Sequence, residues 1–305
     1  YSNDMDRLAS APKYREALFN PKVEYFNVPL LRDTKEIERP AEQRTITRRY
    51  TEETIKFIKA KKDKPFFVYL AHSLPHVPLF RDKPFVGVSK RGLYGDVIEE
   101  IDWSVGQVLK TLQDEGLAEN TLVWFTSDNG PWLIFDTHGG SAGLLRDGKG
   151  STWEGGMREP GIAWWPGKIK PHTSTAIAST MDIYTTCLTL AGAKVPQDRV
   201  VDGVNLSSVL FKGGKGPRDT MFFYRGEQLY AVRKGAWKAH YITRAAYGRS
   251  QPEKHDPPML YHLGHDPAEK YDLAKENPEV LTDISKAVQE HNAKLVRGEN
   301  QLNTL

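Results

Sequence analysis

The stretch PFFVYLAHSLPH, residues 65–76, decides the predicted fold. Its first half, Phe66–Ala71, is a continuous apolar run, which is typical of a strand buried on both faces of a parallel sheet. From Tyr94 to Asp114 apolar residues recur every three or four positions, which predicts an amphipathic helix. A second apolar run, Leu122–Thr126, follows this helix. Strand, helix and strand in this order predict a βαβ unit with parallel strands.

Further elements extend this α/β pattern in both directions. We predict a helix over Thr51–Lys62, with Thr51 as its N-cap, and another over Met181–Ala191. A third apolar run predicts a strand over Gly161–Trp165. The polar residues 1–45, which are punctuated by prolines, are predicted to form a surface excursion.

The chain changes character after the glycine-rich residues 213–217. Short alternating runs predict strands over Thr220–Tyr224, Leu229–Arg233, Ala236–Ile242 and Met259–His262. A final helix is predicted over Pro278–Lys294. We therefore predict two domains, an α/β domain over residues 1–214 and a small α+β domain with an antiparallel sheet over residues 215–305.

Composition excludes several classes of protein. The 305 residues include 42 Lys+Arg and 39 Asp+Glu, so the formal net charge is 42 − 39 = +3. This small charge argues against nucleic acid as a partner, because nucleic-acid binding needs a basic field. The longest apolar runs fall far short of the roughly 18 residues that a membrane span needs. The one cysteine, Cys187, cannot form an internal disulfide, and its apolar helical neighbours favour a small core residue over a nucleophile.

Two polar clusters follow the two strands of the predicted βαβ unit, His72–His76 after the first and Ser127–Gly130 after the second. Ligands bind beyond the carboxyl ends of such strands, so we expect the clusters to be neighbours. By pattern alone Asp128 and Asn129 form either a turn or a pair of hard oxygen ligands for Ca²⁺ or Mg²⁺. His76 is either a packing histidine or a general acid or base, and His72 is expected to point inward as support.

The stretch Gly143–Gly150 matches the spacing of a phosphate-binding loop up to Lys149 and then fails. Gly150 stands where that loop needs Ser or Thr, so we reject a nucleotide site. What remains is Lys149 in a flexible glycine frame, where it is either an anion-binding group or an ordinary exposed lysine. His255, His262 and His265 have no partners that the pattern identifies.

Three motifs in this order, FFVYLAHSLPHVP (66–78), FTSDNGP (125–131) and GLLRDGKGSTWEGGMREP (143–160), resemble those of the type I sulfatases. The branch of arylsulfatase A and N-acetylgalactosamine-6-sulfatase is the most similar. The stretches AVRKGAWKAHY (231–241) and DPPMLYHL (256–263) fit the same family. The resemblance covers essentially the whole chain. It implies an alkaline-phosphatase-like α/β sandwich with a mostly parallel central sheet, followed by a small antiparallel sheet domain.

The resemblance also implies roles for five residues. Asp128 and Asn129 match half of the family's divalent-metal ligands, usually for Ca²⁺, with Mg²⁺ as the alternative. His76 matches the histidine that contacts the ester oxygen and protonates the leaving group, and Lys149 matches the lysine that binds a sulfate oxygen. His255 resembles, more weakly, a histidine that lines the substrate cleft in some members.

One part of the family's pattern is missing. The family's nucleophile is a formylglycine made from Cys or Ser in a C/S-x-P-x-R motif, and these 305 residues contain no such motif. Tyr1-Ser2-Asn3-Asp4 resembles the stretch that follows the motif in the family. We therefore expect this chain to be the back two-thirds of a sulfatase. Alone, it is expected to be inactive, to bind Ca²⁺ weakly and to be poorly soluble.

The expected function of the complete protein is hydrolysis of aryl or sugar sulfates. The alternatives are a phosphate-ester hydrolase of the same superfamily and a non-catalytic module derived from a sulfatase. The expected partner is a sulfated small molecule or sugar, and the oligomeric state is left open. The family implies an exported protein, periplasmic or extracellular, with the lysosome as the alternative, and the single cysteine favours the former.

Overall fold

The computed structural model describes residues 7–248, 250–296 and 298, so the motif at Tyr1–Asp4 lies outside the described residues. The chain forms two compact units, each assembled from separate stretches of sequence. The first comprises Tyr1–Trp124, Trp132–Ser141 and Ala163–Lys168, and the second comprises Phe125–Pro131, Ala142–Ile162 and Ile169–Leu305. The predicted domain boundary between residues 214 and 215 stays a prediction.

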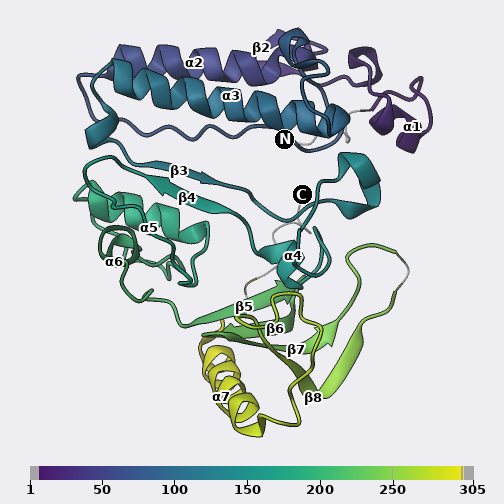
Figure 1. The fold of residues 1–305 in the computed structure, drawn as a ribbon, viewed down its shortest axis with the longest axis vertical. Coiled ribbons are helices and arrows are strands. Elements are labelled where there is room, and N and C mark those ends of the chain that lie inside the picture. The colour runs from purple at the N-terminus through teal and green to yellow at the C-terminus, as the bar shows by residue number, and fades with distance from the viewer. Residues whose placement is uncertain (1–6, 249, 297, 299–305) are drawn as a thin grey trace. The chain divides into compact units, whose positions relative to one another are not determined.

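Two long helices, α2 (Ile46–Lys61) and α3 (Gly92–Asp114), lie side by side in the first unit (Figure 1). The bounds of α3 confirm the helix that the apolar spacing predicts. Helix α2 begins five residues earlier than predicted, so Thr51 is not its N-cap. Instead, the buried Thr51 hydroxyl donates to the Thr47 carbonyl at 2.7 Å and lies 2.5 Å from the Ser104 hydroxyl of α3. Thr51 therefore joins the two helices.

The predicted strand Phe66–Ala71 is wrong in two respects. The segment has no strand partner among the described residues. Its side chains alternate: Phe66, Val68 and Leu70 are half-buried, whereas Phe67 and Tyr69 are 69% and 84% exposed. A strand is buried on both faces only when neighbouring strands and covering layers flank it. Here one face packs, with Phe66 against the cluster around Ile58 and Leu112.

The second predicted strand is present as β3 (Val123–Thr126), which pairs with β4 (Gly161–Trp164) in a two-stranded sheet. It is half-buried rather than fully buried, because Phe125 is 38% exposed. The division between the two units passes through both strands. Because Phe66–Ala71 forms no strand among the described residues, the predicted βαβ unit of Phe66–Ala71 and Leu122–Thr126 is wrong.

The segment predicted to be a surface excursion contributes to the core instead. It contains helix α1 (Tyr14–Phe19) and the hairpin of β1 (Leu30–Arg32) and β2 (Lys35–Glu38). Ala17 and Leu18 are fully buried in a cluster that includes Leu79 and Val97. The prediction of a surface excursion is therefore wrong. Isolated apolar residues among prolines produced no period that could reveal this packing.

The second unit contains helices α4 (Glu154–Met157), α5 (Met181–Leu190) and α6 (Ser207–Lys212), and a four-stranded antiparallel sheet. The strand order is β5-β6-β7-β8, with bounds Thr220–Arg225, Gln228–Lys234, Trp237–Thr243 and Glu253–His262. Helix α7 (Pro278–Lys294) covers one face of this sheet (Figure 1). Leu281 and Ile284 pack there on Val232, Ala239 and Leu260. The predicted sheet and final helix are confirmed, although β8 begins six residues earlier than predicted.

Within the described ranges, the helices are too short or too polar to cross a lipid bilayer.

Candidate active site

The turn Asp128–Gly130 follows β3 and is bound to a distant stretch of main chain. Asp128 is exposed, Asn129 is half-buried and Gly130 is buried. The Gly130 N–H donates to the Gly156 carbonyl at 3.2 Å. A Cβ at position 130 would lie 1.9 Å from the Gly155 carbonyl oxygen, so only glycine fits here. The two predicted metal ligands are thereby held at a fixed place against residues 155–156.

Residues 146–155, here called the lysine loop, fold back on themselves around Lys149. The Gly155 N–H donates to the Arg146 carbonyl at 2.8 Å and closes the loop. The Lys149 N–H donates to the Pro131 carbonyl at 2.9 Å, two residues after Asn129. The structure therefore brings the main chains of Asp128, Asn129 and Lys149 together in one hydrogen-bonded cluster, here called the turn–loop contact. Of the glycines in the predicted flexible frame, Gly148 is buried, whereas Gly143 and Gly150 are exposed, so the flexibility of this frame stays a prediction.

Glu159 is an acidic neighbour of the turn that the sequence analysis missed. Burial and the nearby charge of Asp128 raise the pKa of Glu159, against a hydrogen bond from Ser127 that lowers it. Its Oε1 atom is buried and has no hydrogen-bond partner. The effect of the Asp128 charge indicates that the two carboxyl groups interact electrostatically. The sequence signal for Glu159 was its place in Arg158-Glu159-Pro160, at the end of the motif over residues 143–160.

The donors at this turn suit a hard cation but do not complete a site. Asp128, Asn129 and the unpartnered oxygen of Glu159 offer carboxylate and amide oxygens, the ligands that Ca²⁺ and Mg²⁺ prefer. Within the part of the chain that the structure describes, no three His, Cys, Asp or Glu side chains are grouped so as to hold a metal ion. Because Ca²⁺ takes about six to eight oxygen ligands, these residues fit part of a coordination shell.

His76 belongs to the first unit and has a fixed ring orientation. Its Nδ1 lies 2.7 Å from the Val77 carbonyl oxygen, and its ring packs 5.2 Å from the Trp132 ring. A carbonyl only accepts, so Nδ1 carries the hydrogen and Nε2 is the nitrogen that can take or give a proton. The expected placement of His76 beside Asp128 stays a prediction, because the two residues belong to different units.

His72 points inward, as expected of a supporting residue. Its Nε2 lies 3.3 Å from the Ser104 hydroxyl, which in turn contacts Thr51. Burial lowers the pKa of His72, so the ring is neutral near pH 7. It therefore ties the segment before His76 to α3 rather than contributing a proton.

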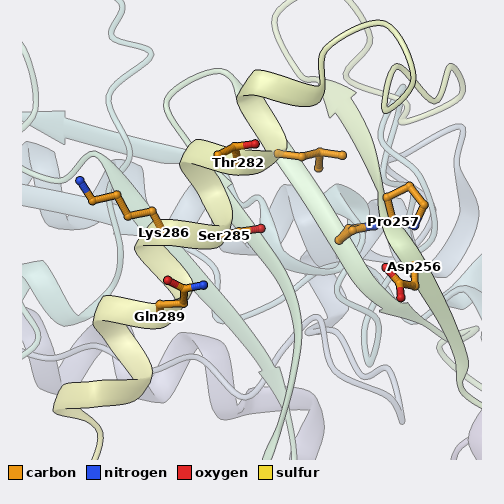
Figure 2. Close-up of a pocket in the computed structure, with 8 residues that line it drawn as sticks. Asp256, Pro257, Thr282, Ser285, Lys286 and Gln289 are labelled. Carbon is orange, nitrogen blue, oxygen red and sulfur yellow. The ribbon is translucent and has the colours of Figure 1, made fainter.

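His255, on β8, is half-buried, and its Nε2 lies 2.8 Å from the Thr243 hydroxyl of β7. One groove, of about 430 Å³, separates the Asp256–Pro258 part of β8 from Thr282 and Ser285 of α7 (Figure 2). The described residues that line this groove include Asp256 but none of the predicted site residues. The weak assignment of His255 to a substrate cleft thus gains no support from this groove.

Two family models match the chain. The model described as Sulfatase matches residues 1–193, and the model described as the C-terminal region of aryl-sulfatase matches residues 216–305. The chain belongs to the sulfatase family.

Curated sulfatases are similar to this sulfatase chain over most of its length. N-acetylgalactosamine-6-sulfatase of Mus musculus is 40% identical over 313 residues, which cover 91% of this chain and 60% of that protein. Arylsulfatase A of Homo sapiens is 42% identical over 243 residues, which cover 72% of this chain and 47% of that protein. This chain therefore spans 60% or less of the length of these two relatives.

A solved structure supports the fold. The PsFucS1 sulfatase from Pseudoalteromonas sp. superposes with a TM-score of 0.78 at 28% identity, covering 84% of this chain and 56% of that one. The predicted fold class, an alkaline-phosphatase-like α/β domain followed by an antiparallel sheet domain, is confirmed.

The sulfatase chain also carries a buried charged face that the sequence analysis missed. Lys238 and His240 of β7 are fully buried, although they occupy the polar positions of an alternating strand. In the register of the sheet Lys238 lies opposite Arg233 of β6 and Tyr261 of β8, whereas Ala239 lies opposite Val232. Side chains opposite one another share a face, so Lys238 and His240 lie on the face away from α7.

Burial and pairing set the charge states on this face. Burial lowers the pKa of His240 and outweighs the hydrogen bond to Glu269, so the ring is neutral near pH 7. Burial alone would raise the pKa of Glu269, but the His240 hydrogen bond and the Lys238 charge lower it overall. The face therefore holds one ammonium group, Lys238, between the carboxylates of Glu154 and Glu269.

Cys187 is half-buried on α5, and burial raises the pKa of its thiol. A thiol in this state is a poor nucleophile, which agrees with the predicted packing role.

Proposed function

We propose that the complete protein hydrolyses sulfate esters of aryl or sugar alcohols. The observation that carries this proposal is the turn–loop contact, in which the Lys149 N–H donates a hydrogen bond to the Pro131 carbonyl next to the Asp128–Gly130 turn. This contact brings the main chain of Lys149 close to the turn that carries Asp128 and Asn129. An ammonium group suits a sulfate ester, which carries negative charge on its non-bridging oxygens. The names of the relatives, N-acetylgalactosamine-6-sulfatase and arylsulfatase A, support the choice of sulfate over other esters.

Each residue has a separate task in this proposal. Lys149 binds a non-bridging sulfate oxygen and stabilises charge that develops as the ester bond breaks. His76 donates its Nε2 proton to the bridging oxygen, which leaves as a neutral alcohol or phenol. The Nδ1 contact with Val77 keeps the ring in the orientation for this transfer. Removal of such a general acid lowers a rate by roughly 10²–10⁴-fold.

Asp128 and Asn129 would hold part of a divalent-metal site, most simply for Ca²⁺. When bound, the metal would polarise a sulfate oxygen as a Lewis acid. The sequence contains no C/S-x-P-x-R motif, so the proposal places the formylglycine nucleophile outside these 305 residues. His255 stays a weaker proposal for the substrate cleft. We also propose that the protein is exported, because the resemblance implies an exported or lysosomal enzyme.

The proposal is tested by expressing the complete coding sequence and comparing turnover of matched aryl sulfate and aryl phosphate esters. We expect faster sulfate turnover, and we expect His76→Ala and Lys149→Met each to reduce it. Faster phosphate turnover would favour the phosphate-ester hydrolase instead. No turnover of either ester by the complete protein would favour the non-catalytic module.

A further inference from the structure

A network of buried ionisable side chains joins the C-terminal sheet to the lysine loop. The Lys238 Nζ lies 2.8 Å from Glu154 Oε1 and 3.4 Å from Glu269 Oε1. The His240 Nε2 lies 2.7 Å from the same Glu269 oxygen. None of the four side chains is more than 2% exposed. They come from three separate parts of the chain: strand β7, the end of the lysine loop and the turn after β8.

Both ends of the lysine loop are fixed to this network. Glu269 Oε2 accepts the Glu154 N–H at 2.6 Å, and the Glu269 carbonyl accepts from Arg146 Nη1 at 2.8 Å. The Arg146 guanidinium also lies 3.6 Å from the centre of the Trp153 ring, which packs on His240. A single residue, Glu269, therefore contacts the first residue of the loop and the residue before its last.

The backbone of Glu269 shows that its position is constrained. Its φ is +51°, in the left-handed region that residues other than glycine rarely adopt. Asp147, inside the lysine loop, has a φ of +60°, and its side chain accepts from the Gly148 and Ala246 amides. Such conformations persist only where surrounding contacts hold them, and they concentrate at functional sites.

Stability alone does not explain why these groups are charged. Moving charges out of water is costly, and apolar residues of similar size often stabilise a core as well or better. The opposite face of the same sheet is built in that way, from Val232, Ala239 and Leu260 against α7. Charged pairs differ from apolar contacts in that they fix a geometry through directed hydrogen bonds.

We propose that Lys238, Glu154 and Glu269 are positioning residues that hold the lysine loop so that the Lys149 side chain meets the sulfate group. This inference rests on the proposed function. It makes the C-terminal sheet part of the catalytic apparatus through the loop, although Lys238 acts only through other residues. The consequence is that loss of Lys238 harms turnover mainly through Lys149.

The test is a cycle of kcat/KM measurements on the complete protein with Lys238→Met, Lys149→Met and the double variant. We expect Lys238→Met to lower kcat/KM for an aryl sulfate at least tenfold when Lys149 is present. In the Lys149→Met background we expect a change of less than about threefold. Equal effects in both backgrounds would show a general structural role and would overturn the proposal.

Ile284→Ala provides the matched control. Ile284 is fully buried on α7, against the apolar face of the same sheet, and its truncation leaves a cavity that destabilises the fold. We expect this variant to be destabilised while kcat/KM below its melting temperature stays unchanged. A loss of kcat/KM as large as that of Lys238→Met would contradict the proposal. If Lys238→Met does not fold, Glu269→Gln takes its place, because it keeps an acceptor for the Glu154 amide.

Hydrogen exchange separates a failure of this inference from a failure of the proposed function. In the complete protein we expect Lys238→Met or Glu269→Gln to speed amide exchange in a peptide covering residues 146–156 by about tenfold. Ile284→Ala is expected to leave that peptide unchanged. This readout needs no turnover, so it decides the positioning role even if the wild-type protein cleaves no sulfate ester. Unchanged exchange in all variants would overturn the inference.

Discussion

The ammonium group of Lys238 lies 2.8 Å from the carboxylate of Glu154, and both side chains are shielded from solvent. The two residues are 84 positions apart in the sequence, one on β7 and the other at the start of α4. Glu154 Oε2 lies 4.0 Å from both Arg158 and Arg233, so Lys238 provides its closest positive charge. The pair is thus a direct link between the C-terminal sheet and the lysine loop.

Lys238→Met is expected to lower the free energy of unfolding by about 3–5 kcal/mol, because it leaves the Glu154 charge buried without its partner. Adding Glu154→Gln removes that charge and is expected to restore part of the loss. Urea unfolding of the complete protein measures both variants. A double variant whose loss equals the sum of the two single losses would show that the pair does not interact.

Gly130→Ala is expected to disrupt the turn–loop contact beside Asp128, because the alanine Cβ would overlap the Gly155 carbonyl oxygen. We expect the free energy of unfolding to fall by about 1–3 kcal/mol or more, which is the usual cost of inserting an atom against rigid backbone. Gly106→Ala in α3 is the control. Nothing lies within 4 Å of its Cβ, so we expect a gain of about 0.5–1 kcal/mol. Equal stabilities for the two variants in thermal unfolding would refute the steric argument.

Glu100→Gln is expected to change how stability depends on pH. Glu100 is buried on α3, and burial raises its pKa from 4.5 to about 7, despite the hydrogen bond from the Asp82 N–H. Between these two values the folded protein binds the proton more tightly than the unfolded chain does. Stability therefore falls as pH rises from 4.5 to 7, by about 3 kcal/mol at 1.36 kcal/mol per pKa unit.

Glutamine cannot ionise, so the variant is expected to be more stable than the wild type at pH 8 and similar at pH 4.5. Urea unfolding at the two pH values gives the comparison. The same pH dependence in the variant and in the wild type would show that Glu100 ionises normally in the folded protein.

Asp128→Ala is expected to remove most of the stabilisation that Ca²⁺ gives the complete protein. A ligand at 100 times its Kd stabilises the folded state by about 2.7 kcal/mol, and loss of one carboxylate ligand weakens that binding. The measurement is the Tm with Ca²⁺ and with a chelator. Asp102→Ala, which removes an exposed carboxylate from α3, is the control and is expected to respond to Ca²⁺ as the wild type does. An equal response in Asp128→Ala would place the metal elsewhere.

Periodic segments were predictable from the sequence, because the spacing of their apolar side chains indicates which face of the element is buried. Apolar residues spaced three and four apart predicted α3, and the predicted bounds of α3 and α7 lie within two residues of the observed bounds. The resemblance implied one site for Asp128, Asn129 and Lys149, and the structure brings the two segments together through the hydrogen bond from the Lys149 N–H to the Pro131 carbonyl. These features depend on local pattern or on short connections.

The remaining features depend on partners distant in sequence. The apolar run Phe66–Ala71 predicts a strand that is buried on both faces. The exposure of its side chains, however, depends on which other segments pack against each face. Lys238 and His240 occupy the polar positions of an alternating strand, which normally face solvent, and only Glu154 and Glu269 reveal that they are buried. Single-sequence reasoning has no access to such pairings.

The proposed role of Lys149 in sulfate-ester hydrolysis is tested by the kcat/KM of the complete protein for an aryl sulfate, measured for the wild type and for Lys149→Met. We predict that the wild type turns over the aryl sulfate faster than the matched phosphate ester. We also predict that kcat/KM falls by about 10²–10³-fold in Lys149→Met, the usual cost of removing a group that stabilises developing negative charge. Sulfate turnover that is unaffected by Lys149→Met would contradict this role.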